Sequence, residues 1–204
     1  MKKTKFLQIL TGLFVGCLLI SNILAAKTFT IGSVVLPTAV IIFPVVYIVN
    51  DVLAEIYGYA EAKKVIWLGF AVNAIAVLAY TIAIALPAPE YATETAAAFA
   101  ATLGSTGRML IASFAAYIVG SLINAKVMVL MKGRNENRLM LRCVTSTAIG
   151  EGIDALLFIT IAFFGTMPLA TLGIMIISQA TFKTVYEIIS YPVTRAVINK
   201  VKKL

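Results

Sequence analysis

Two acidic residues lie three positions apart inside a strongly apolar stretch of the chain. In the run TSTAIGEGID at residues 145–154, Glu151 and Asp154 fall on one face of a helix, because residues i and i+3 are neighbours there. An ionisable group near the centre of a bilayer costs about 3 kcal/mol on insertion scales, so such groups mark ligand sites, ion paths or buried pairs. Gly150 and Gly152 would let a ligand or a neighbouring helix approach the backbone. Small residues also serve helix packing, but two carboxylates exceed what packing needs, so we expect this face to be functional.

A lysine and a glutamate form a second pair farther along the chain. Lys183 and Glu187 are at i and i+4 in an apolar segment that also carries several hydroxyl side chains. Lys183 could pair with Glu187, or across to Asp154 or Glu151 on the neighbouring helix. A purely structural buried pair is the alternative interpretation, although such a pair can also be broken and remade during transport.

The richest local cluster is the block YIVNDVLAEIYGY at residues 47–59. Asp51 and Glu55 are i and i+4 on one face, and Tyr47 lies one turn before them. Carboxylates accept hydrogen bonds from N–H groups and aromatic rings stack, so this combination suits a planar base. The later tyrosines could instead belong to an interfacial aromatic belt, and carboxylates alone could equally bind a cation or carry protons.

Two asparagines, Asn22 and Asn124, add amides that offer a donor and an acceptor at once, which suits the edge of a heterocycle. The chain has no histidine, and its two cysteines lie far apart with no second ligand type nearby, so we expect no metal, no cofactor and no catalytic residue. The run GEGID at residues 150–154 resembles the Gly-x-Gly-Asp element of membrane aspartyl proteases, but its spacing differs. We therefore expect a protein that is not an enzyme.

The elements that must position these residues are membrane-spanning helices. Apolar residues make up 61% of the 204 residues and charged residues 13%, against about 45–50% and 25% in soluble domains. About 20 helical residues cross a hydrocarbon core of roughly 30 Å, whereas an isolated strand cannot satisfy its backbone in lipid. We predict an all-α integral membrane protein, a bundle of six transmembrane helices in a single domain over residues 1–204. The expected spans lie near 6–26, 33–53, 64–86, 109–131, 143–165 and 170–193.

The basic residues set the expected orientation. Of the 17 Lys and Arg, 13 fall in connections on one side of the six spans, and only Lys27 and Arg108 fall on the other, so both termini should be cytoplasmic in the inner membrane. This pattern accounts for the net charge of +8 without nucleic acid. The outward connection 87–108 could form a short interfacial or re-entrant helix, and Pro44 and Pro192 should kink their helices.

With these residues in view, the sequence resembles the queuosine precursor transporter family, also called the vitamin uptake transporters, over nearly the whole chain. The Asp-x-x-x-Glu-x-Tyr-Gly-Tyr block at residues 51–59 is the most specific part of the resemblance. The other residues that carry it are Ser21, Asn22, Lys27, Pro44, Trp67, Arg108, Ser121, Asn124, Arg142, Ser146, Thr147, Gly150, Asp154, Lys183, Tyr186, Glu187 and Pro192.

The resemblance implies import of 7-deazaguanines, such as the queuosine precursors preQ0 and preQ1 or queuine, into the cytoplasm. It also implies a bundle related in shape to the substrate-binding subunits of energy-coupling-factor importers, working without a dedicated ATPase. Carboxylates would accept hydrogen bonds from the base, asparagines would read its edge and a lysine would balance charge. The expected substrate-binding residues are Asn22, Tyr47, Asp51, Glu55, Asn124, Glu151, Asp154, Lys183 and Glu187.

Three alternatives stay open at this point. The chain could be a binding subunit that docks on an energising module through the small-residue face of its first helix, from Gly12 to Gly16. Transport could be coupled to protons, or it could be passive diffusion followed by metabolic trapping. The chain could also act as a monomer or as a homo-oligomer in the lipid bilayer.

Overall fold

Seven α-helices and one β-hairpin make up the part of the chain that the structure describes. The structure is a computed structural model, and it describes residues 3–24, 27–31, 34–104, 107–132, 138–165 and 168–202. Some basic residues used to orient the chain, Lys2, Arg134 and Lys203, lie outside these ranges.

Five helices are long and apolar enough to cross a membrane. They contain 22 to 34 residues, which at 1.5 Å per residue gives lengths of about 33–51 Å, enough for a hydrocarbon core of about 30 Å. They are α1 (Lys3–Leu24), α3 (Tyr59–Ala85), α5 (Gly107–Lys132), α6 (Leu139–Phe163) and α7 (Leu169–Lys202). Long apolar helices are thus found at five of the six predicted positions.

The prediction of one continuous helix over residues 33–53 is wrong. Strands β1 (Thr28–Ile31) and β2 (Val34–Pro37) form an antiparallel hairpin, followed by the 3-10 helix η1 (Thr38–Ile41). Nine of the 15 residues 28–42 are β-branched, which favours extended backbone over helix. Helix α2 (Phe43–Tyr57) begins only afterwards, and its 15 residues extend about 23 Å, less than a full crossing. The predicted all-helical class is therefore confirmed, with one short hairpin beside the helices.

The two ends of α2 are set by a proline and a glycine. Pro44 lies in the first turn of α2, where its missing N–H is no loss, so the expected kink at this residue does not occur. Gly58, with φ of 83°, separates α2 from α3, and this left-handed conformation is one that glycine adopts without steric cost. Pro192 does lie inside a helix, α7, as expected.

Helix α2 is the most enclosed helix of the bundle. It lies among α1, α5 and α7, and ten of its 15 residues are buried. Its contacts with α1 and α3 are apolar, through residues such as Leu53, Phe14 and Ile66. Its opposite side faces α5, α6 and α7 and carries the polar residues described below.

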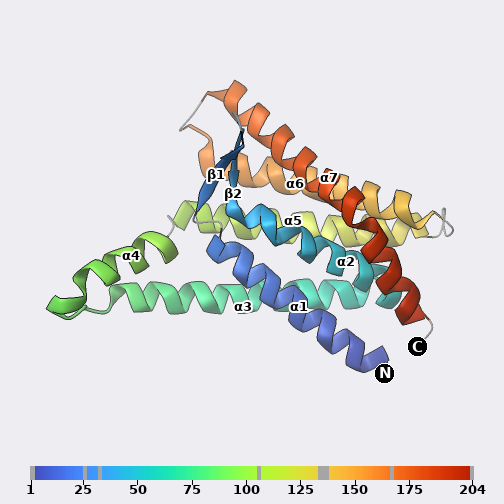
Figure 1. The fold of residues 1–204 in the computed structure, drawn as a ribbon, viewed down its shortest axis with the longest axis horizontal. Coiled ribbons are helices and arrows are strands. Elements are labelled where there is room, and N and C mark those ends of the chain that lie inside the picture. Colours follow the sequence, from blue (N-terminus) through green and yellow to red (C-terminus); the bar gives the residue numbers. More distant parts are fainter. Residues whose placement is uncertain are drawn as a thin grey trace.

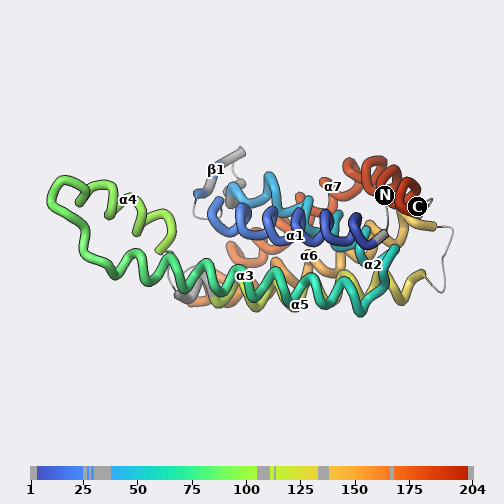
Figure 2. Tube along the Cα trace, turned by 90° about the horizontal axis from the view of Figure 1, so that it is seen from below, coloured from blue at the N-terminus to red at the C-terminus, as the bar shows by residue number. Residues whose placement is uncertain are grey.

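The remaining elements, η2 (Glu90–Ala92) and α4 (Thr93–Leu103), lie together at one end of the bundle (Figure 2). The connection after α3 contains both of them, which confirms that a short helix forms there. Figure 2 shows α4 at the end of the molecule opposite to both described ends of the chain. The first described residues of α1 and the last described residues of α7 lie close together at that opposite end in both views, Figure 1 and Figure 2.

Candidate functional site

Five carboxylates and two basic side chains are buried inside the helical bundle, among the residues that the structure describes. Each of these side chains belongs to a residue that is at most 5% exposed. Isolated ions at such depth are strongly disfavoured, so these groups must be paired, hydrogen-bonded or neutralised by protons. They are Asp51, Glu55, Glu151, Asp154, Glu187, Arg142 and Lys183.

One side of α2 organises these groups. Phe43, Tyr47, Asp51 and Glu55 follow one another at intervals of four residues, so they form a stripe along one face of the helix. From residue 43 to residue 55 the stripe extends about 18 Å. We call the polar contacts along this stripe the polar column, and it has three levels.

The first level is centred on Lys183 of α7. Its Nζ atom lies 2.5 Å from Glu151 Oε2 and 3.0 Å from Asp154 Oδ2, both on α6. The same atom lies 4.3 Å from the centre of the Phe43 ring and 5.9 Å from that of Tyr47, within the range of cation–π attraction. Of the partners considered for Lys183, the structure selects the two acids across the helix interface rather than Glu187 on its own helix.

Two glycines allow α5 and α6 to approach closely beside this level. A Cβ atom on Gly150 would lie 2.8 Å from Asn124 Cβ and 3.0 Å from the Gly120 carbonyl oxygen. A Cβ on Gly120 would lie 2.8 Å from the Tyr47 hydroxyl and 2.9 Å from Asp154 Cβ. Gly150 thus serves the close helix approach expected for it, whereas a Cβ on Gly152 would meet nothing within 4 Å.

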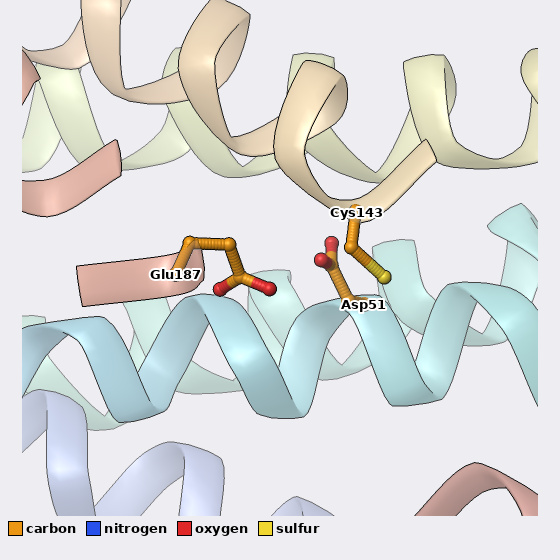
Figure 3. A group of neighbouring side chains, drawn as sticks. All are labelled: Asp51, Cys143 and Glu187. Carbon is orange, nitrogen blue, oxygen red and sulfur yellow. The ribbon is translucent and has the colours of Figure 1, made fainter. Parts of the chain in front are cut away.

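The second level surrounds Asp51. Its Oδ1 atom accepts hydrogen bonds from Asn124 Nδ2 at 3.0 Å and from Ser146 Oγ at 3.4 Å. Side-chain atoms of Asp51, Cys143 and Glu187, one carboxylate oxygen from each acid and the thiol sulfur, lie within 4.8 Å of one another. Figure 3 shows the carboxylates of Asp51 and Glu187 next to each other between the helices. Among the described residues, only three side chains could supply a metal-ligand atom here, whereas a structural zinc site uses four protein ligands. We assign no metal to this group.

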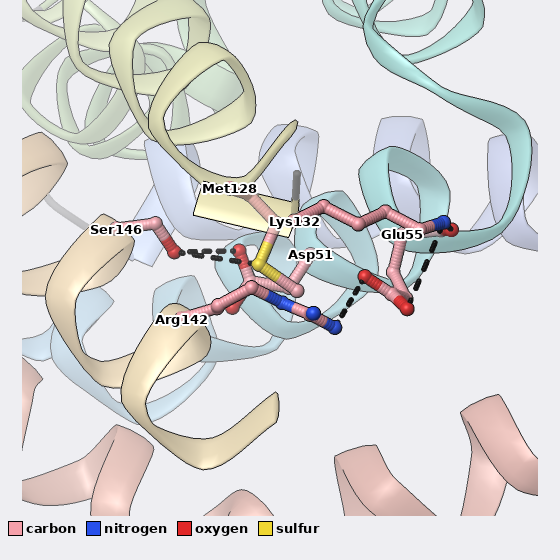
Figure 4. A network of polar contacts seen from close by, with 6 residues as sticks. All are labelled: Asp51, Glu55, Met128, Lys132, Arg142 and Ser146. Atoms are coloured by element: carbon pink, nitrogen blue, oxygen red, sulfur yellow. Dashed lines mark hydrogen bonds and ion pairs between the residues drawn. The ribbon is translucent and has the colours of Figure 1, made fainter. Parts of the chain in front are cut away.

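The third level pairs Glu55 with basic side chains. Arg142 Nη2 lies 2.7 Å from Glu55 Oε2, and Lys132 Nζ lies 3.7 Å from Glu55 Oε1 (Figure 4). Lys132 also donates a hydrogen bond of 2.6 Å to the backbone carbonyl of Glu55. Arg142 was counted among the basic residues of a cytoplasmic connection, but this placement is wrong, because the residue lies inside α6 and is fully buried.

Eight of the nine expected substrate-binding residues contribute to these levels, and Asn22 has a different partner. Its Nδ2 donates a hydrogen bond of 2.5 Å to Asn73 Oδ1, which joins α1 to α3. Both asparagines line a small crevice with Tyr80 and Leu103.

Sequence reasoning missed several members of the polar column. Phe43 was not considered, and Ser146 was named only among the residues that carry the family resemblance. Cys143 was considered only as a possible metal ligand, and Lys132 was among the basic residues counted in the connections. The four-residue spacing from Phe43 to Glu55 was a usable signal for Phe43. Nothing local distinguishes Lys132, whose role depends on which helix it faces.

The charge balance of the column limits what it can bind. Five buried carboxylates face two buried cations, and Lys132, with 37% of its side chain exposed, adds a third. The excess is two to three negative charges in an interior where uncompensated charge is costly. Such a site suits a ligand that donates several N–H groups or carries positive charge, and it also suits protons.

A helical membrane protein with charged side chains buried deep among its helices has the features of a transporter interior. The comparisons with known proteins agree. Residues 37–197 match the family described as "Putative vitamin uptake transporter", so the chain belongs to the vitamin uptake transporter family, and the resemblance seen in the sequence is confirmed. The protein is therefore a membrane transporter and not an enzyme.

A relative in Bacillus subtilis (strain 168), named "Probable queuosine precursor transporter", is 26% identical over 175 residues. The match covers 84% of this chain and 76% of the relative. No solved structure matches the chain.

Proposed function

We propose that this protein imports queuosine precursors, 7-deazaguanines such as preQ0 or preQ1 or the base queuine, across the inner membrane into the cytoplasm. Two things support the proposal: the name of the Bacillus relative and the composition of the polar column. The observation that carries it is the excess of buried carboxylates beside aromatic rings. A guanine-like edge presents several N–H donors, and carboxylates are acceptors without competing donors.

The Lys183 level is the proposed binding site for the base. Glu151 and Asp154 accept N–H groups of the base, and the rings of Phe43 and Tyr47 offer faces for stacking. Lys183 occupies both carboxylates in this structure, so the base must displace its ammonium group. Because the substrate replaces one set of charge-assisted bonds with another, binding and opening of the ion pairs are linked.

The proposed topology has six membrane-embedded helices in one domain, with both termini in the cytoplasm. Helix α2 is the sixth, and its ends are completed by η1 and by the turn at Gly58. Its short length is tolerable because it is enclosed by protein rather than by lipid. No dedicated ATPase is required in this scheme.

The test is uptake by cells that cannot make queuosine precursors. Cells expressing the protein should restore queuosine in their tRNA when supplied with preQ0 or preQ1. Asp154→Asn and Glu151→Gln should abolish this recovery because each removes an acceptor for the base. Glu61→Gln is the matched control, since this acid pairs only locally with Lys64 on a solvated part of α3. Normal uptake by both site variants at equal protein level would reject the assignment.

A substrate-binding subunit of an energy-coupling-factor type importer is the second candidate. One observation favours it: Cβ atoms added at Gly12 and Gly16 of α1 would meet nothing within 4 Å, so a small-residue face is open to a partner helix. Purified protein in sealed liposomes distinguishes the two. Transport of preQ1 with no second protein present excludes an obligatory module.

A further inference from the structure

Two of the five buried carboxylates have no cationic partner among the residues that the structure describes. Glu55 is paired with Arg142 and Lys132, and Lys183 serves both Glu151 and Asp154. Within the described ranges, no Lys or Arg nitrogen lies within 4.0 Å of Asp51 or Glu187. The two unpaired acids lie at the same level of the polar column.

These two acids face each other across the interface of α2 and α7. Asp51 is 0% exposed and Glu187 is 1% exposed, and their carboxylate atoms lie within 4.8 Å (Figure 3). Asp51 Oδ2 and Glu187 Oε1 are both buried without a hydrogen-bond partner in the described part of the chain. A hydrogen atom on one of the two carboxylates could give these unsatisfied oxygens a hydrogen-bond partner.

The groups around the pair are neutral donors or are engaged elsewhere. Helix α5 contributes Asn124, and α6 contributes Ser146 and the Cys143 thiol, all uncharged. The charged neighbours are committed to other partners: Glu55 of α2, Lys132 of α5 and Arg142 of α6 form the third level, and Lys183 of α7 joins the two acids of α6. In the described part of the chain, no cation at this level therefore compensates a second negative charge.

Two buried carboxylates this close together are strongly disfavoured when both are ionised, so we expect one of them to carry a proton. We infer that Asp51 and Glu187 form the binding site of a coupling proton, which this transporter carries inward together with its substrate. The inference rests on the proposed function for the identity of the co-transported base, but not for the existence of the proton site.

The position of the pair connects it to the proposed binding site for the base. Asp51 lies one helical turn after Tyr47 on α2, and Glu187 lies one turn after Lys183 on α7. The proton binds to the pair when the pair is open to the outside. It leaves one of the two carboxylates when the pair is open to the cytoplasm. With a neutral base, each cycle moves one positive charge inward.

The first experiment measures transport of radiolabelled preQ0 by the full chain in proteoliposomes. Wild-type protein should accumulate preQ0 under an inwardly directed proton gradient, by up to about tenfold per pH unit for one proton. Glu187→Gln and Asp51→Asn should lose this accumulation, while circular dichroism and size-exclusion profiles equal to those of the wild type show that both variants are folded. Glu61→Gln, which changes an acid outside the column, should behave as wild type.

A second experiment detects the proton without any substrate. Infrared difference spectra of purified protein should show the carbonyl band of a protonated carboxyl group at neutral pH, and both Glu187→Gln and Asp51→Asn should remove it. Absence of the band from the wild type, or its survival in both variants, would overturn the proton site. Accumulation driven by a sodium gradient, or gradient-driven uptake that both variants retain, would overturn the coupling role. The band without any preQ0 exchange would reject the proposed function and uphold the proton site.

Discussion

Gly150 holds α5 and α6 close together, and replacing it with alanine should loosen the polar column. The new methyl group would lie 2.8 Å from Asn124 Cβ and 3.0 Å from the Gly120 carbonyl oxygen, where an ordinary contact needs about 3.5 Å. Restoring that distance requires α5 to move by about 0.7 Å, since 3.5 minus 2.8 is 0.7. One of the two atoms belongs to the backbone, so the strain cannot be relieved by a rotamer change alone.

The expected magnitude follows from comparison with Gly152→Ala on the same helix. Overpacking costs about 1–3 kcal/mol, and Gly-to-Ala substitution in a helix gains up to about 1 kcal/mol. A methyl group on Gly152 meets nothing within 4 Å, so it receives only the gain. The difference between the two variants in free energy of unfolding should therefore be about 1–3 kcal/mol. The same displacement would lengthen the bond of 3.0 Å from Asn124 to Asp51, so deazaguanine uptake should also fall.

The assay is reversible unfolding of each purified variant in mild detergent, followed by circular dichroism. Gly150→Ala should unfold at lower denaturant concentration than wild type, and Gly152→Ala at an equal or higher one. Equal stability of the two variants would show that α5 and α6 are not in close contact at Gly150, and the described geometry of the polar column would then be wrong.

Three further outcomes are expected. Arg142→Met should lower the free energy of unfolding by about 3–5 kcal/mol because it strands the buried Glu55 carboxylate, and Glu55→Gln in the same chain should recover part of that loss, as thermal unfolding can measure. Lys183→Met should abolish preQ1 uptake in cells, while Lys183→Arg keeps the charge and should retain some activity. Tyr47→Ala should weaken preQ1 binding roughly 5- to 150-fold in calorimetry, the equivalent of about 1–3 kcal/mol of stacking, whereas Tyr47→Phe should not.

Most of the helices and many of the candidate site residues could be predicted from hydropathy and from charges in apolar stretches. Glu151, Asp154 and Lys183 were conspicuous because nothing in lipid compensates a charge, and their mutual pairing required only that α6 and α7 be neighbours. Arg142 was wrongly placed in a connection because the sequence does not show which residue it pairs with. A cation at the end of an apolar stretch usually faces water, and its burial depends on Glu55, a partner 87 residues away.

The hairpin and the shortness of α2 were also beyond a hydropathy argument. Residues 28–42 are as apolar as a transmembrane helix, so an averaged hydropathy scale cannot tell the strands at 28–31 and 34–37 from part of a helix. The excess of β-branched residues there was the available signal. The proximity of Asp51 and Glu187 could not be predicted from the sequence, because it depends on how α7 is rotated relative to α2.

Helix α2 connects the three levels of the polar column, so a movement of this helix displaces side chains at all of them. Its stripe supplies a member to every level, Phe43 and Tyr47 to the first, Asp51 to the second and Glu55 to the third. Helix α2 has about four turns and moves as a rigid unit, so rotation about its axis displaces all these side chains together. A substrate that reorients Tyr47 therefore also changes the surroundings of Asp51 and the Arg142 pair. Movement of α2 would therefore connect the proposed base site with the proposed proton site without a relay of intervening residues.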